Sequence, residues 1–313
     1  MQERRTGGPP MTIATQRVES GPATSVAGIA MALCAFAMFT GMDSGIKLLA
    51  GRYHVLQVMF LNSVFALPAV VAIAAARGRL HLLWPKHWRL HLARWGVSYL
   101  ATIAIFSSYP HLALADAYAI LFSAPLMITA FSSLLLHERV GPRRWCAVAA
   151  GFAGVLVILA PGQGTIALAG LVVLAGAVGH AFNMLYVRKI GLVGEAVEAT
   201  GTAGNLLTCL VSPLFLPWIW QTPSAPDLGL TAVAGLVAGS AFLLLAAAYR
   251  TAPAAAVAPF QYSQMLYGIL VGWLLFGDWP SARMLLGSAI IVASGLYVLQ
   301  HEMRGLRPRT SGA

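Results

Sequence analysis

Charged residues are scarce in this chain. Of its 313 residues only 10% are charged, whereas 58% are hydrophobic. A soluble domain carries about 25% charged residues, so the composition excludes an ordinary soluble domain. The hydrophobic residues fall into blocks of the length, roughly 20 residues, that a helix needs to cross a bilayer. The sequence therefore predicts an all-α polytopic membrane protein.

Cysteines and catalytic motifs are also scarce. Cys34, Cys146 and Cys209 lie far apart within hydrophobic blocks, which favours neither a disulfide framework nor a metal site. His87 and His91 are one helical turn apart, but no carboxylate or thiolate accompanies them in the sequence, so neither a metal nor a cofactor is expected. The chain contains no HExxH, GxSxG or GxxxxGK[ST] pattern, which argues against an enzyme and against an ATP-driven pump.

The basic residues are distributed unevenly between the two sides of the predicted membrane. With the N-terminus in the cytoplasm, 17 of the 20 Lys and Arg residues lie on the cytoplasmic side, and only Lys47, Arg52 and Arg283 lie outside. This positive-inside bias predicts a multi-pass protein of a bacterial-type inner membrane with both termini cytoplasmic. It accounts for the net charge of +10 without a nucleic-acid partner. Within the first cytoplasmic loop, between the second and third spans, Pro85 is expected to start a basic surface helix. The ten predicted spans are residues 25–49, 55–76, 94–110, 116–136, 144–160, 167–187, 196–220, 228–248, 254–276 and 282–300.

Two segments of the chain resemble each other. They are LLLHERVGPRRWCAVAAGFAGVLVIL (134–159) and LLFGDWPSARMLLGSAIIVASGLYVL (274–299), in which Glu138 aligns with Asp278. Five spans separate the copies, and an odd number reverses their orientation in the membrane. Inverted repeats are the architecture of many secondary transporters, with the substrate site at the repeat interface. The predicted organisation is a disordered cytoplasmic tail (1–22), two inverted five-helix repeats (23–160 and 161–303) and a second disordered tail (304–313).

The same regions carry a family resemblance. AYRTAPAAAVAPFQYSQMLYGILVGWLLFGDWPSARMLLGSAII (248–291) resembles the second-half signature of the EamA-type exporters of the drug/metabolite transporter (DMT) superfamily, and ADAYAILFSAPLMITAFSSLLLHERV (115–140) is similar to its first-half copy. The resemblance runs from about residue 25 to residue 300. It implies a fold of five plus five inverted helices and the export of small metabolites, often amino acids. Relatives often carry an arginine in the second helix, where this chain has Asn62.

The expected function is therefore secondary transport by alternating access. Amino acids, including aromatic or neutral ones, are the first candidate substrates for export. Carriage of another metabolite class, such as nucleosides, cofactors or amphipathic drugs, is the alternative, and a channel is less favoured. The expected partners are a small-molecule substrate and membrane lipids. Proton antiport and facilitated diffusion are both compatible with the sequence, as is any oligomeric state.

The stretch CAFAMFTGMDSGIKLLAGRY (34–53) places Asp43 and Lys47 one turn apart near the end of the first span. An ion pair at this spacing contributes only about 0.2–0.5 kcal/mol in water. Lys47 lies at the C-terminal end of its helix, where a cation complements the helix dipole, and Lys189 is its counterpart in the second repeat. Asp43 has no acidic counterpart, since Leu185 holds that position. Asp43 is therefore predicted to face the outward mouth of a cavity, where it holds Lys47 or meets the substrate.

Two polar pairs occur in the second half of the chain. His180 and Asn183 share a helix face about midway through the sixth span, and Gln261 and Gln264 share a face in the ninth. Amide groups suit recognition of carboxylate, amine or amide groups, and a histidine can also carry a proton. Hydrogen bonding between helices without a ligand is the alternative for each pair.

Three further candidates lie in the first half. Tyr99 and Thr102 belong to one stripe of the third span, although such stripes are more often packing surfaces than binding sites. Pro125 lies within the fourth span and frees a backbone carbonyl, which is tolerated where protein or a watery cavity satisfies it. All nine residues are candidate substrate-binding residues, and no catalytic residue is expected. These candidates are Asp43, Lys47, Tyr99, Thr102, Pro125, His180, Asn183, Gln261 and Gln264.

Overall fold

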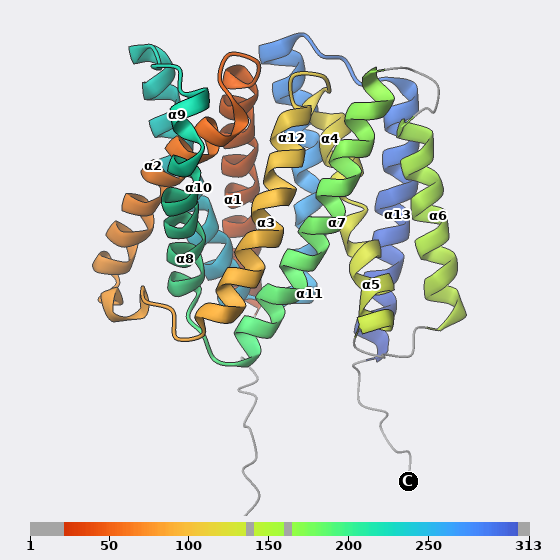
Figure 1. Ribbon diagram of the computed structural model, residues 1–313. Coiled ribbons are helices and arrows are strands. Elements are labelled where there is room, and N and C mark those ends of the chain that lie inside the picture. The colour runs from red at the N-terminus through yellow and green to blue at the C-terminus, as the bar shows by residue number, and fades with distance from the viewer. Residues whose placement is uncertain (1–21, 136–140, 160–164, 306–313) are drawn as a thin grey trace, which may run out of the picture.

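The computed structural model describes residues 22–135, 141–159 and 165–305 (Figure 1). Regular secondary structure within these ranges is helical. The α-helices are α1 Pro22–Leu49, α2 Val55–Ala76, α3 Trp88–Ser108, α4 Leu114–Leu121, α5 Ala124–Leu135, α6 Pro142–Leu159, α7 Thr165–Leu192, α8 Val197–Val211, α9 Leu216–Ile219, α10 Ala225–Thr251, α11 Ala254–Val257, α12 Ser263–Val271 and α13 Ala282–Gly305.

The hydrophobic blocks of the sequence coincide with helices. Each of the ten segments predicted as spans is helical over most of its described length. Six regions are long and apolar enough to cross a membrane by length and composition: residues 26–49, 55–76, 114–131, 167–192, 225–251 and 282–300. The protein is therefore an all-helical membrane protein. Most of both predicted tails (1–21 and 306–313) lies outside the described residues, and helix α13 includes residues 304 and 305, which the sequence analysis assigned to the second tail.

Helix α3 differs from its prediction. The basic segment after Pro85 was expected to form a separate surface helix, but it supplies the first turns of α3, which begins at Trp88 and runs without a break to Ser108. The polar residues His91 and Arg94 are consequently buried inside the bundle. Burial is possible because their polar partners come from segments about 100 residues away, which local sequence patterns do not reveal.

Two of the predicted spans are interrupted. In the fourth, α4 and α5 are separated at Phe122 and Ser123, immediately before the helix that contains Pro125. In the ninth, a 3₁₀ turn over Ala258–Tyr262 joins α11 to α12. The two interruptions meet, because the rings of Phe122 and Tyr262 pack edge to face with their centroids 5.1 Å apart.

The two halves of the chain are packed into one another. Helix α1 packs along α10, α3 packs along α7, and α6 packs along α13, so each of these pairs joins one half to the other (Figure 1). Helices α6 and α13 approach each other at Gly154 and Gly287, where a Cβ built on Gly154 would lie 2.8 Å from the carbonyl oxygen of Gly287. Small residues at such crossings allow two backbones to approach, as is usual between membrane helices.

Candidate functional site

A cavity of about 270 Å³ lies between α1, α2, α3, α8 and α10. We call it the α3–α8 cavity. Its volume is close to the lower end of the range of about 300–1,000 Å³ that is typical of small-molecule sites. Helix α3 contributes Arg94, Ser98, Thr102 and Phe106, which are spaced at i, i+4 and therefore share one face. This stripe changes from charged through hydroxyl-bearing to aromatic along about 18 Å of helix.

Aromatic rings form much of the wall, and two of them are fixed in place. The rings of Trp95 and Tyr99 lie 4.9 Å apart, with an angle of 31° between their planes. The indole Nε1 of Trp95 donates a hydrogen bond to Thr208 Oγ1 at 3.0 Å, and the hydroxyl of Tyr99 is 2.9 Å from Ser212 Oγ. Trp95 is thus held against α8 and Tyr99 against the 3₁₀ turn that follows it, and both rings line the wall. Phe39, Phe106 and Phe242 are the other aromatic lining residues.

Neutral polar side chains complete the lining. The side-chain oxygen of Asn62 is buried and has no hydrogen-bond partner among the described residues. Asn205 donates through Nδ2 to the carbonyl oxygen of Gly201 at 3.0 Å. Together with the hydroxyl groups of Ser98 and Thr102, these amides can hydrogen-bond a ligand that lies in the cavity.

Arg94 is the one charged residue in the described lining of this cavity. It is 8% exposed. Its Nη1 donates to Asn183 Oδ1 at 3.2 Å, and its Nη2 donates to the backbone oxygen of Thr200 at 3.1 Å. The Nε atom is buried without a partner, and no acidic side chain of the described ranges forms an ion pair with this guanidinium. Both hydrogen-bond acceptors of Arg94 are therefore neutral.

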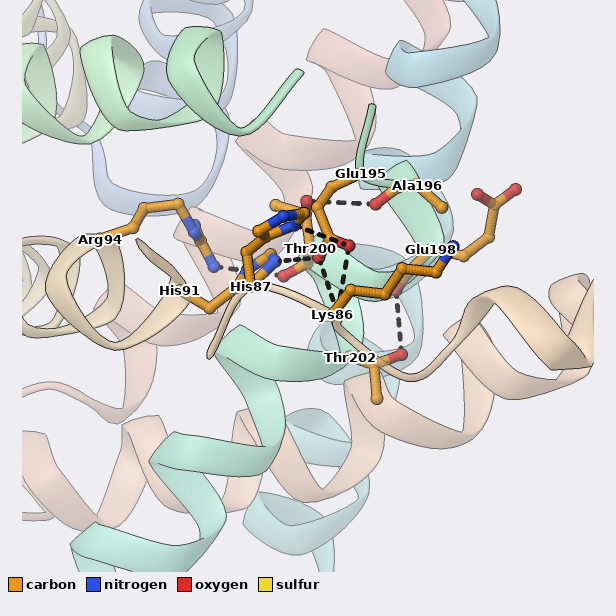
Figure 2. Close-up of polar contacts among 9 residues, drawn as sticks. All are labelled: Lys86, His87, His91, Arg94, Glu195, Ala196, Glu198, Thr200 and Thr202. Atoms are coloured by element: carbon orange, nitrogen blue, oxygen red, sulfur yellow. Dashed lines mark hydrogen bonds and ion pairs between the residues drawn. The ribbon is translucent and has the colours of Figure 1, made fainter. Parts of the chain in front are cut away.

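The loop that follows α7 carries Glu195 and Ala196 and lies near Arg94 (Figure 2). The carboxylate of Glu195 lies 2.7 Å from His91 Nε2 and accepts from the backbone N–H of Lys86 at 3.1 Å. The pKa of Glu195 lies below its ordinary value: burial raises it, but hydrogen bonds from His91 and from the backbone N–H groups of Lys86 and His87 lower it by more. This end of the molecule is thus held together by a buried, ionised carboxylate.

A second acid on the same side is held by two arginines. Glu198, in the first turn of α8, accepts from Arg79 Nη1 at 3.1 Å and lies 3.6 Å from Arg250 Nη2. The side chain of Glu198 is almost fully buried, whereas the two arginines are partly exposed. The negative charge of Glu198 is therefore balanced by two arginines that do not line the cavity.

Asp43 and Lys47 do not pair with each other, although their spacing permits it. Asp43 is buried and accepts a hydrogen bond of 2.7 Å from the hydroxyl of Tyr118. Lys47 instead forms an ion pair with Asp278, at 2.8 Å, and donates to the backbone oxygen of Leu112 at 2.9 Å. Neither Asp43 nor Lys47 lines the α3–α8 cavity.

The other predicted site residues divide between the cavity and its surroundings. Tyr99 and Thr102 line the cavity. Asn183 lies outside the lining and accepts a hydrogen bond from Arg94, which belongs to it. His180 is exposed on the surface of α7. The remaining three lie outside the lining: Pro125 in the first turn of α5, Gln261 in the 3₁₀ turn, and Gln264 in α12.

Sequence reasoning missed several of the lining residues, above all Arg94, Trp95 and Asn205. Arg94 was counted among the cytoplasmic basic residues, because it stands at the start of a hydrophobic block. A usable signal was present, since Arg94, Ser98 and Thr102 recur every four residues and give α3 a polar face. In α8, Thr200, Gly204 and Thr208 recur at the same spacing, with Asn205 next to Gly204.

A second cavity of about 210 Å³ lies towards the other end of α3. Its lining includes Tyr53, His54, Val58 and Pro110 from the segments that surround the end of α1. Phe106 lines both cavities and therefore stands between them.

Comparison with known proteins assigns the family. Two stretches of the chain, residues 26–160 and 167–300, match the EamA-like transporter family. The protein belongs to the EamA-like transporter family. This confirms the resemblance to the DMT superfamily, and it makes the protein a transporter and not an enzyme.

Three relatives of this EamA-like transporter come from bacteria. A riboflavin transporter of Rhizobium johnstonii is 33% identical over 241 residues, which cover 77% of this chain and 78% of the relative. A riboflavin transporter of Vibrio cholerae is 35% identical over 194 residues, or 60% of this chain and 63% of the relative. An S-adenosylmethionine uptake transporter of Rickettsia conorii is 24% identical over 292 residues, or 90% and 96% of the two chains.

A solved crystal structure shares the fold of this EamA-like transporter. It superimposes with a TM-score of 0.60 over 91% of this chain and 99% of its own, at 19% sequence identity. At this level of identity the likeness concerns the fold alone.

Proposed function

We propose that this protein carries a planar heteroaromatic cofactor of the riboflavin type across the membrane by alternating access through the α3–α8 cavity. The observation that carries the proposal is the pair of fixed rings, Trp95 and Tyr99, in a wall that also presents neutral hydrogen-bonding groups such as Asn62. An extended ring system can stack on such a surface, while its carbonyl, N–H and hydroxyl groups bond to the amides and hydroxyls. The names of the Rhizobium and Vibrio relatives support the same substrate class.

Cofactors were the alternative in the sequence analysis, and amino acids were the first candidate. The relatives favour the alternative, because those named here carry riboflavin or S-adenosylmethionine. S-adenosylmethionine is the second candidate substrate, since the Rickettsia relative matches over nearly its whole length.

We also propose that all ten helical segments cross the inner membrane as two inverted five-helix repeats, over residues 23–160 and 161–303. Both termini then lie on the cytoplasmic side. The bias of the basic residues, the two family matches and the interruption of the fourth and ninth segments support this arrangement. Interrupted helices at corresponding positions of two repeats are typical of secondary transporters.

Cysteine labelling in intact cells tests this topology. In a variant without the native cysteines, Thr222→Cys between α9 and α10 should react with an impermeant reagent from outside. Arg77→Cys, which follows α2, should react only after permeabilisation. Both residues are exposed in the structure. The reverse pattern would overturn the proposed orientation.

Among the predicted site residues, we propose Tyr99 and Thr102 as direct substrate contacts, and Asn183 as the residue that positions Arg94. The proposal rests on their place in the cavity wall and on the 3.2 Å bond between Asn183 and Arg94.

Binding and uptake measurements test the proposed substrate. Purified protein should quench riboflavin fluorescence on binding, and proteoliposomes should accumulate riboflavin in a saturable manner. Trp95→Leu should weaken riboflavin binding about 10-fold or more, because stacking on an aromatic ring contributes about 1–3 kcal/mol per base. Trp84→Leu is the matched control, since Trp84 is 66% exposed and lies outside the cavity. Uptake of S-adenosylmethionine but not of riboflavin would favour the second candidate, and uptake of neither would overturn the proposal.

A further inference from the structure

The charges at the Arg94 end of the cavity are unevenly balanced. Glu195 is held by His91 and by backbone N–H groups (Figure 2). Glu198 is paired with Arg79 and Arg250. Neither acid forms an ion pair with Arg94. The positive charge of Arg94 is therefore not cancelled by any acid of the described residues within ion-pairing distance.

The guanidinium of Arg94 lines the cavity and has more donors than the hydrogen bonds it makes. A guanidinium carries five N–H groups, and two nitrogen atoms of Arg94 each make one bond, to Asn183 and to Thr200. The third, Nε, is buried and makes none. A Cβ built on Gly204 would lie 2.8 Å from Nη2, so the guanidinium occupies the space that this glycine leaves open on α8. The group is thus fixed in the cavity wall with at least one donor unused.

We propose that Arg94 selects substrates by charge: its guanidinium donates to an oxygen or ring-nitrogen acceptor of the substrate and excludes cations from the cavity. This inference rests on the proposed transport of heteroaromatic cofactors, and it separates the two substrates that the relatives carry. Riboflavin is neutral and has carbonyl and ring-nitrogen acceptors. S-adenosylmethionine carries a sulfonium and an ammonium group against one carboxylate, so its net charge is positive.

The expected size of the discrimination follows from Coulomb's law. A sulfonium about 8 Å from the guanidinium, at an effective dielectric constant of about 20, should bind about 30-fold more weakly than an uncharged sulfur in the same place. S-adenosylhomocysteine provides this comparison, because it lacks the methyl group and the sulfonium charge but keeps the rest of the molecule.

The test measures binding of three ligands to the purified full-length protein: riboflavin directly, and the two adenosyl compounds by displacement of riboflavin. The wild type should bind S-adenosylhomocysteine about 30-fold more tightly than S-adenosylmethionine. Arg94→Gln should remove this difference and weaken riboflavin about 10-fold, since a charge-assisted hydrogen bond is lost. Arg94→Lys keeps the charge, so the difference between the adenosyl compounds should remain. Arg89→Gln is the matched control, because it removes an equal charge from the exposed face of the same helix.

A second variant keeps the test decisive if Arg94→Gln fails to fold. Ser98→Asp places a carboxylate one turn from Arg94 in the cavity wall and leaves the arginine in place. It should improve S-adenosylmethionine binding about 10-fold or more relative to S-adenosylhomocysteine. Equal binding of the two compounds by the wild type would overturn the charge selection while leaving riboflavin transport intact. So would a difference that persists in Arg94→Gln or, where that variant does not fold, a difference that persists unchanged in Ser98→Asp. Failure of the wild type to bind any of the three ligands would overturn the proposed function and the charge selection together.

Discussion

Lys47 and Asp278 form an ion pair of 2.8 Å across 231 positions of the chain. The ammonium group of Lys47 also donates to the backbone oxygen of Leu112 and lies 4.4 Å from the centre of the Phe276 ring. This single side chain therefore joins the end of α1 to the segment before α4 and to the turn before α13. Both members of the pair lie at the end of the bundle that we propose to face outside.

The contacts of Lys47 predict that position 47 needs a positive charge on a long side chain. Lys47→Arg should keep most of the thermal stability and transport, because a guanidinium can still donate to Asp278 and to Leu112. Lys47→Met should lower stability by about 1–3 kcal/mol, since it leaves a charged acceptor and a buried carbonyl oxygen without their donor. Thermal unfolding in detergent measures both variants. If Lys47→Met is additive with Asp278→Asn, the two residues do not act as a pair.

Asp43 is predicted to act on transport and not on binding. Its carboxylate is buried, bonds to Tyr118 and makes no ion pair with a basic residue of the described ranges. We expect Asp43→Asn to reduce uptake severely and to abolish any acceleration by a pH gradient, because the amide cannot carry a proton. Riboflavin affinity should stay within about twofold, since Asp43 does not line the cavity. Proteoliposome uptake with and without a gradient, compared with fluorescence titration, separates the two effects.

Tyr118→Phe is the control for this prediction, because it removes the hydrogen bond and keeps the carboxylate. A loss of riboflavin affinity in Asp43→Asn would instead support a direct contact between Asp43 and the substrate, which was one of the predictions from the sequence.

Gln261 and Gln264 are half-buried in the interrupted ninth segment, outside the α3–α8 cavity. The double variant Gln261→Leu/Gln264→Leu should therefore keep riboflavin affinity within about twofold. Asn205→Leu, in the cavity wall, should weaken riboflavin binding about 10-fold, because a hydrogen-bonding group is lost. Equilibrium binding measures both. Weaker riboflavin binding in the glutamine variant alone would show that the substrate site lies in the interrupted segment, as predicted from the sequence.

The hydrogen bonds of Glu195 predict a pH-dependent stability. Because the folded state holds the pKa of Glu195 below the ordinary value of 4.5, the stabilisation is complete above that value and is lost as the pH falls through the lower, folded value. Glu195→Gln should lower the thermal midpoint by about 5 °C at pH 7. The difference should shrink as the pH falls below 4.5 and through the folded pKa of Glu195, where the wild-type carboxylate becomes protonated.

Thermal scans of both proteins across this pH range provide the measurement. A difference that stays constant from pH 7 down to the lowest pH at which both proteins remain folded would show that the loss does not arise from the ionised form of Glu195.

The positions of the helices were predictable from the sequence. Hydrophobic blocks of sufficient length form helices because the bilayer leaves backbone polar groups no other partners, and this requirement is local. The membership of the transporter family was likewise visible in two quoted segments, 115–140 and 248–291, because each carries its signature within one stretch of chain.

The partners of the polar residues were decided only by the tertiary structure. Local spacing places Asp43 next to Lys47, yet Tyr118 holds the first and Asp278 the second. Arg94 reads as one of many cytoplasmic basic residues, and it becomes a cavity residue because α7 and α8 supply Asn183 and Thr200. The physical reason is the same in both cases: a charge within a hydrophobic bundle is stable only beside a polar partner, and the packing of distant helices determines which partner comes within about 3 Å.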